Sequence, residues 1–127
     1  MSADDLLFMP ATRAAALIRR RELSPVAYVD AVLAAIARAQ PVLNCFAVVD
    51  EKGARRDAIA AERAIVPGAA LGPLHGVPVH IKDLIDAAGL RTGNGSAIFA
   101  DAAPAAQDRR SASATINSSC RLRPSAP

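Results

Sequence analysis

One lysine in an apolar setting is the residue of this 127-residue chain best placed to do chemistry. Lys82 follows a short apolar run, residues 77–81, which is introduced by a turn rich in glycine and proline. Such a run between turn residues is typical of a strand that is buried on both faces. Burial can lower a lysine pKa from about 10.4 far enough to make the amine a base near pH 7. Lys82 is therefore a candidate base, although spacing alone favours an inert lysine that is solvated or paired with Asp83 or Asp86.

Two histidines lie close to this lysine in the sequence. His75 falls in the turn, where we expect it to hydrogen-bond the backbone. His80 precedes Lys82 by two residues, so the alternation of a strand places both side chains on one face. A protonated His80 could tune the lysine, but a satisfied neutral histidine is the favoured interpretation.

Carboxylates and glycines follow the lysine. Asp83 and Asp86 could indicate acid–base work or a metal, but no third ligand stands in register, so turn capping is favoured. The loop over residues 89–96 is rich in glycine, as phosphate-binding loops are, yet it lacks the lysine of a P-loop. We assign no catalytic role to Ser96.

Composition excludes several classes of function. Cys45 and Cys120 have no ligand spacing, so we expect reduced thiols, no metal and no cofactor; Cys45 is interpreted as a small buried hydrophobe. The net charge is +3, but four arginines and no acid follow Asp108, so a nucleic-acid surface within the fold is not expected. No apolar run approaches the ~20 residues that span a bilayer. A cytoplasmic protein without a membrane segment is expected.

Apolar spacing and turn residues predict the elements that position the lysine. A helix is expected after Pro10, and its final basic run, Arg19-Arg20-Arg21, is interpreted as a solvated helix end rather than an anion site. Ser24 and Pro25 predict the start of a second helix, which should end near Gln40 because Pro41 disfavours helix before it.

The remaining elements alternate between strand and helix. We expect a strand over 43–49, a helix over 54–65 and the lysine-bearing strand over 77–81, which together indicate an α/β fold. Four residues form the predicted buried face of the middle helix: Ala54, Ala58, Ala61 and Ile65.

The stretch Gly72-Pro73-Leu74-His75-Gly76-Val77-Pro78-Val79, followed by Ile81-Lys82-Asp83, closely resembles the N-terminal part of the amidase signature family. The likeness runs from Leu6 to about Asp108. It implies an incomplete amidase signature fold, with helices and strands of a mixed sheet, and a glycine-rich loop beside the active site. It also implies that Lys82 belongs to a Ser–cis-Ser–Lys triad that hydrolyses or transfers amides.

The same resemblance limits what can be said of the substrate. A small-molecule amide is implied, but substrate-binding residues of the family lie largely in its later part, so they remain unknown here. A transamidating enzyme component that acts on charged tRNA is as compatible as a small-amide hydrolase.

Residues 109–127 depart from the family, which supplies its two serines and its oxyanion-hole amides from a later segment rich in glycine and serine. No glycine follows Gly95, and Asn117-Ser118-Ser119-Cys120 is not that segment. We therefore expect an amidase part over 1–108 and a divergent, disordered tail over 109–127. A shift of reading frame near Asp108 is our hypothesis; a natural short form or an incomplete gene model is the alternative.

Two predictions follow for the chain by itself. With one triad residue of three it should be inactive, and an uncovered edge of the strand over 77–81 should make the monomer marginal or prone to self-association. The alternative function is a non-catalytic α/β module that binds a partner through this edge and the basic tail.

Overall fold

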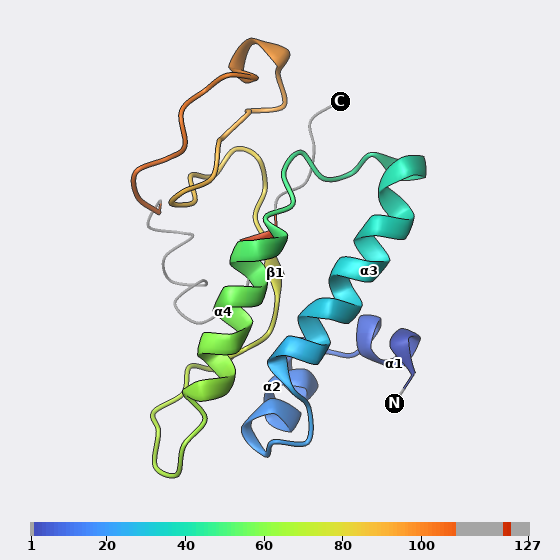
Figure 1. The fold of residues 1–127 in the computed structure, drawn as a ribbon, viewed down its shortest axis with the longest axis vertical. Coiled ribbons are helices and arrows are strands. Elements are labelled where there is room, and N and C mark those ends of the chain that lie inside the picture. Colours follow the sequence, from blue (N-terminus) through green and yellow to red (C-terminus); the bar gives the residue numbers. More distant parts are fainter. Residues whose placement is uncertain (1, 109–120, 123–127) are drawn as a thin grey trace.

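A computed structural model of the protein describes residues 2–108 and 121–122. Within these residues, the chain forms the helices α1 (Ala3–Leu7), α2 (Ala11–Arg19), α3 (Pro25–Leu43) and α4 (Glu51–Arg63), the short strands β1 (Val79–His80) and β2 (Arg121–Leu122), and the 3-10 turn η1 (Ala97–Phe99). Figure 1 shows α3 and α4 side by side, with α1 and α2 near one end of the pair and η1 near the other.

The α3–α4 pair forms one hydrophobic core. Its buried residues are Val29, Leu33 and Ile36 from α3 and Ala54 and Ala58 from α4. The small alanines let the two helices approach closely, and the large aliphatic side chains of α3 fill the space. An ion pair of 2.7 Å between Arg55 and Asp30 joins the exposed sides of the helices.

Capping residues explain where both helices begin. The Ser24 hydroxyl accepts a hydrogen bond from the Ala27 amide at 3.3 Å, and Pro25 occupies the first turn, as predicted. Asp50 caps α4 by accepting from the Gly53 amide at 2.9 Å. That second cap starts α4 at Glu51, three residues before the predicted start. The helix ends at Arg63, two residues before the predicted end. Ala54, Ala58 and Ala61 form its buried face as predicted, and Ile65 is buried beyond the end of the helix.

A second core joins α2 to the start of α3 and to the turn before β1. Its buried residues are Ala14, Ala15, Ile18, Leu23, Tyr28, Ile65 and Val77. Segments from three parts of the chain therefore meet around α2, and the turn that introduces the lysine packs directly on them.

The predicted strand over 43–49 is wrong. α3 continues through Pro41 to Leu43 and ends at Asn44, whose left-handed backbone has φ 44°. The Gln40 side chain then replaces a neighbouring strand: its amide donates to the Phe46 carbonyl at 2.8 Å and accepts from the Phe46 N–H at 3.0 Å. Backbone groups that would have joined a ladder are satisfied in this way.

The predicted strand over 77–81 is shortened to β1. The Val77 amide donates within the turn to the Leu74 carbonyl at 3.1 Å, and Pro78 has no N–H for a ladder. Val77 and Ile81 are buried whereas His80 is exposed. The run is therefore buried on one face, and the prediction of burial on both faces is wrong.

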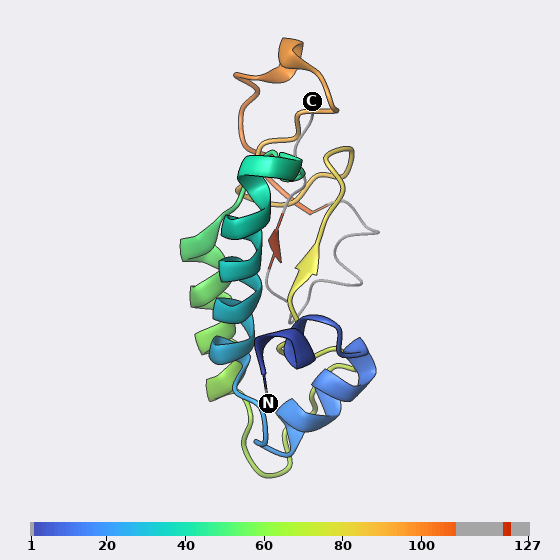
Figure 2. The same ribbon diagram turned by 90° about the vertical axis from the view of Figure 1, so that its right-hand side faces the viewer.

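The sheet is smaller than predicted. In the described residues it has two parallel strands, with Val79 opposite Arg121 and His80 opposite Leu122. Figure 2 shows both strands on the same side of the α3–α4 pair. The described chain is mostly helical, so the predicted mixed sheet is not confirmed.

Two expectations about other segments also change. By length and composition α3 could cross a membrane, contrary to the prediction that no apolar run is long enough; in the described structure one face of this helix packs on α4. Residues 121–122 of the tail form β2, whereas the disorder predicted over 109–120 and 123–127 lies outside the described residues.

Candidate active site

The turn before β1 is fixed to the helices by three separate contacts. The Arg19 guanidinium of α2 donates to the Gly72 carbonyl at 2.6 Å. His75 is buried and its Nε2 lies 2.8 Å from the Ala61 carbonyl of α4, so this nitrogen carries the proton and donates. The predicted backbone hydrogen bond of His75 is thus confirmed, and its partner makes it structural.

Gly76 supplies the third contact. Its φ is +74°, and a Cβ there would lie 3.0 Å from Pro25 Cγ and 3.3 Å from Ile18 Cγ2. Both the left-handed backbone and the close approach therefore require glycine. The start of β1 is seated against the corner between α2 and α3.

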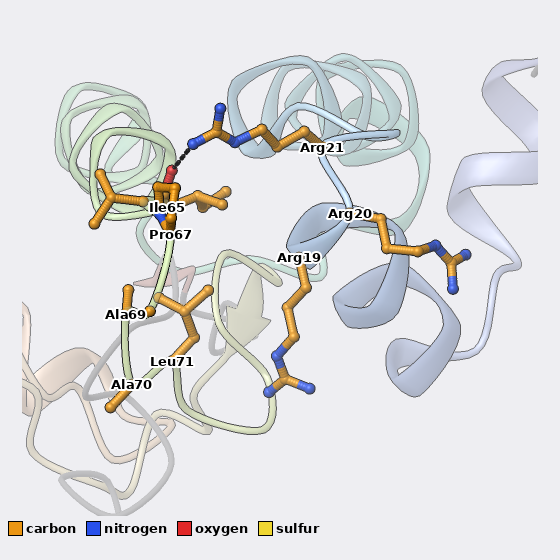
Figure 3. Close-up of a pocket in the computed structure, with 10 residues that line it drawn as sticks. Arg19, Arg20, Arg21, Ile65, Pro67, Ala69, Ala70 and Leu71 are labelled. Carbon is orange, nitrogen blue, oxygen red and sulfur yellow. Dashed lines mark hydrogen bonds between the residues drawn. The ribbon is translucent and has the colours of Figure 1, made fainter.

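The basic run at the end of α2 lines a hollow with residues 65–71 (Figure 3). The three guanidinium groups point apart in this view. Arg21 donates to the Ile65 carbonyl, Arg19 to the Gly72 carbonyl, and Arg20 pairs with Glu22 at 2.7 Å. Arg19 and Arg21 thus hold both ends of the segment that leads into the turn, a role that sequence reasoning missed because both acceptors are backbone carbonyls.

Lys82 follows β1 with its side chain exposed to solvent. It forms no ion pair with Asp83 or Asp86 in the described structure. Its carbonyl accepts from the Ile85 amide at 3.0 Å, which closes a turn directly after it. The desolvation expected for a catalytic lysine is not provided by the described residues.

The residues on either side of Lys82 are both anchored. Ile81 is buried in a small third core with Ala87 and Leu90. Asp83 is 6% exposed, and its carboxylate accepts from the Gly93 amide at 2.7 Å and from the Gly95 amide at 3.3 Å.

The glycine-rich loop is thus organised around Asp83. The Asp83 carbonyl accepts from the Asn94 amide at 2.8 Å, so three successive amides of the loop face one residue. Asn94 and Gly95 have left-handed φ values of 52° and 65°, and their turn forms a cradle in which the Gly93 and Gly95 amides both point at one carboxylate. Here the chain's own carboxylate occupies the cradle, which argues against a phosphate site.

Other polar residues close the same loop layer. Asp86 accepts from the Thr92 hydroxyl at 2.7 Å, and Asp108 accepts from the Ala88 amide at 2.8 Å. Gly89 and Leu90 exchange backbone hydrogen bonds with Ala105 at 2.9 and 3.0 Å. The predicted turn-capping role is confirmed for Asp83, whose carboxylate accepts from backbone amides of the loop, whereas the contact of Asp86 is with the Thr92 side chain and its capping role stays a prediction.

No serine in the described part of the chain is free of a capping role. Ser2, Ser24 and Ser96 each accept a hydrogen bond from a backbone amide at the start of a helix or 3-10 turn. Cys45 is half-buried, less than predicted. Residues 2–108 and 121–122 contain no cluster of three metal-binding side chains.

Comparison with known proteins identifies the family of this chain. A family model described as "Amidase" matches residues 27–112, which include α4, β1, Lys82 and all but the start of α3. The chain belongs to the amidase signature family. Residues 72–79, which carry the resemblance to this family, are the segment that contacts the helices at Gly72, His75 and Gly76.

Three related proteins show how far the likeness to amidases extends. The chain is 36% identical over 101 residues to an acylamidase of Rhodococcus erythropolis, covering 80% of this chain and 21% of that protein. It is 43% identical over 76 residues to a subunit of the glutamyl-tRNA(Gln) amidotransferase of Roseiflexus castenholzii, covering 60% and 15%. A solved bacterial aryl acylamidase of the family superposes with a TM-score of 0.82 at 26% identity, covering 94% and 26%.

The chain thus spans about a fifth of the length of these curated relatives. Its fold agrees with the matching quarter of the solved amidase although its own sheet is very small.

Proposed function

We propose that Lys82 is the base of a Ser–cis-Ser–Lys amide hydrolase whose two serines come from outside residues 2–108. The observation that carries the proposal is the double anchoring of the chain around Lys82, by Ile81 in an apolar core and by Asp83 in the amide cradle. The fold that carries these two anchors is similar to the matching part of a solved aryl acylamidase. An exposed amine between two anchored neighbours is available to a serine that approaches from another segment.

The proposed reaction is acyl transfer from an amide. A nucleophilic serine attacks the carbonyl carbon, and its proton passes through the bridging serine to the neutral Lys82 amine. The lysine then returns a proton to the departing nitrogen, which leaves as an amine. Water hydrolyses the acyl-serine ester and restores the enzyme, while backbone amides stabilise the oxyanion in each step.

We also propose that residues 1–127 by themselves do not catalyse this reaction. The Lys82 side chain is exposed to solvent in the described structure. The described serines serve as caps, and residues 109–127 contain no glycine to form a close backbone oxyanion site. Covering Lys82 with further protein would both desolvate the amine and bring a nucleophile.

The substrate class that we propose is an acyl amide. An acylamidase is among the relatives, and so is a subunit of a glutamyl-tRNA(Gln) amidotransferase. The base and its proton transfers are the same in both cases. A chromogenic acyl anilide therefore tests the hydrolytic chemistry first.

The experiment is reconstitution with the part of the Rhodococcus acylamidase that lies beyond its match to this chain. Each part is assayed alone and together against an acyl p-nitroanilide. Hydrolysis only in the mixture supports the proposal. A stable complex without hydrolysis would instead favour the non-catalytic partner-binding module, and the absence of a complex would count against the proposed division of the active site.

A further inference from the structure

We infer that Asp83 is a positioning residue for Lys82: its buried carboxylate, held by the amides of Gly93 and Gly95, fixes the place of the lysine. This inference rests on the proposed function for its catalytic meaning. It assigns a role to a residue for which sequence reasoning favoured turn capping.

The contacts of Asp83 carry the argument. One side-chain oxygen accepts from Gly93 at 2.7 Å and the other from Gly95 at 3.3 Å, while the backbone carbonyl accepts from Asn94 at 2.8 Å. Hydrogen bonds to an ionised acceptor are stronger than neutral ones. Because the side chain and the backbone of Asp83 hold the same turn, the residue has little freedom to rotate, and this restriction extends to the peptide bond it shares with Lys82.

The glycine loop is shaped for this carboxylate. A Cβ at Gly93 would lie 2.6 Å from Asp83 Oδ2, although the backbone there is not left-handed. The absence of a side chain at Gly93 is thus explained by the close approach of Asp83. Any larger residue at this position must push the carboxylate away.

On the other side of Lys82, Ile81 is buried in the third apolar core. The apolar packing of Ile81 holds the end of β1 against the core. The directional hydrogen bonds of Asp83 then limit rotation of the backbone at Asp83 and Lys82. Together they restrain the backbone from which the exposed Lys82 side chain projects. Removal of the carboxylate should therefore loosen Lys82 without melting α3 and α4.

The test exploits the presence of two lysines, Lys52 and Lys82. Labelling with ¹⁵N-lysine gives one backbone signal from α4 and one from the candidate site, so Lys52 is an internal control. In the unaltered chain both should have order parameters near 0.85, and in Asp83→Asn only Lys82 should fall below about 0.6. The asparagine side chain keeps one acceptor oxygen, but its NH₂ group replaces the oxygen that accepts from Gly95. Two donors would then face each other, and that hydrogen bond is lost.

Two further variants separate positioning from a loss of charge. Gly93→Ala should loosen Lys82 from the opposite side of the same contact. Asp101→Asn removes one exposed carboxylate from the same loop layer and should leave both lysines unchanged. An order parameter of Lys82 that is equal in all variants would overturn the inference. A fall in the order parameters of both Lys52 and Lys82 would also overturn it, because Asp83 would then stabilise the whole fold.

Amide exchange in the unaltered chain provides a check that needs no variant to fold. The Gly93 and Gly95 amides should exchange about tenfold or more slowly than the exposed Gly68 amide. Equal exchange would overturn the inference. None of these measurements requires hydrolysis, so a failed reconstitution would count against the proposed function while leaving the result for Asp83 intact.

In an active reconstituted enzyme, Asp83→Asn should lower kcat with little change in KM. The alteration disturbs the base and not the binding of the acyl group. Unchanged kcat despite a loosened Lys82 would overturn the positioning role.

Discussion

Tyr28 is the only tyrosine in the chain, which contains no tryptophan, so absorbance near 295 nm reports its ionisation alone. The side chain is buried in the core around α2, and this desolvation raises the pKa of its hydroxyl above the ordinary value of 10.0. We expect a titration midpoint above 10.0 in the folded chain and near 10.0 in urea. A midpoint at the ordinary value in the folded chain would contradict the burial of this hydroxyl.

The same shift has a consequence for stability. Because the folded-state pKa exceeds the unfolded one, the contribution of Tyr28 is complete below about pH 10 and is lost as the pH rises through the folded-state pKa. The free energy of unfolding of the unaltered chain should therefore fall relative to that of Tyr28→Phe in this alkaline range. A constant difference between the two would show that the hydroxyl does not contribute in this way.

Gly76 offers a test of the seat beneath β1. Gly76→Ala adds a methyl group against Pro25 and Ile18, whereas Gly68→Ala has a similar φ of +79° with nothing within 4 Å. The two substitutions share the backbone strain, so their difference measures the close contact. We expect Gly76→Ala to cost about 1–3 kcal/mol more in urea unfolding. Equal costs would mean that the turn does not press on α2 and α3.

At the scale of elements, the Gln40 side chain replaces a strand neighbour for Phe46. Gln40→Ala removes both hydrogen bonds to Phe46 and a third to the Asn44 side chain, and it should lower the free energy of unfolding by about 1–2 kcal/mol. Arg38→Ala, at an exposed position of the same helix, is the control and should change little. Similar stability of the two variants would show that the Gln40 bridge contributes nothing.

Helices were more predictable from the sequence than strands. The aliphatic spacing of α3 and the alanines of α4 indicate their buried faces, and Ser24 with Pro25 fixes a start. The strand predicted over 43–49 failed because β-forming side chains do not reveal a bridging side-chain amide such as that of Gln40. The strand over 77–81 shrank because the turn extends to Val77 and Pro78 cannot donate.

The candidate site was predictable only in part. The motif before Lys82 indicated the family, and the position of Asp83 indicated a turn-capping role. The clamp between Asp83 and the loop at Gly93 did not, because it joins residues ten apart through backbone amides. Nor could the sequence show that Lys82 is exposed, since exposure depends on what packs over the end of β1.

At the scale of the whole molecule, several large apolar side chains face solvent in the described structure. Phe8, Val42 and Ile98 are each more than 80% exposed. The two described strands also leave outer edges without a strand neighbour. Such surfaces favour association.

We therefore expect the sedimentation coefficient of the purified chain to rise with concentration, and its thermal unfolding to be broad. Sedimentation velocity over a tenfold or wider range of concentration and a calorimetric scan would measure both. A monomer at every concentration with a sharp, cooperative transition would contradict this prediction.

The most direct test of the account compares two lysines in the reconstituted enzyme. Lys82→Ala removes the proposed base, and Lys52→Ala removes an exposed lysine of α4 as the matched control. We predict that Lys82→Ala lowers hydrolysis of the acyl anilide by about a hundredfold or more while Lys52→Ala retains it. Wild-type rates in the Lys82→Ala enzyme would contradict the assignment of Lys82 as the base.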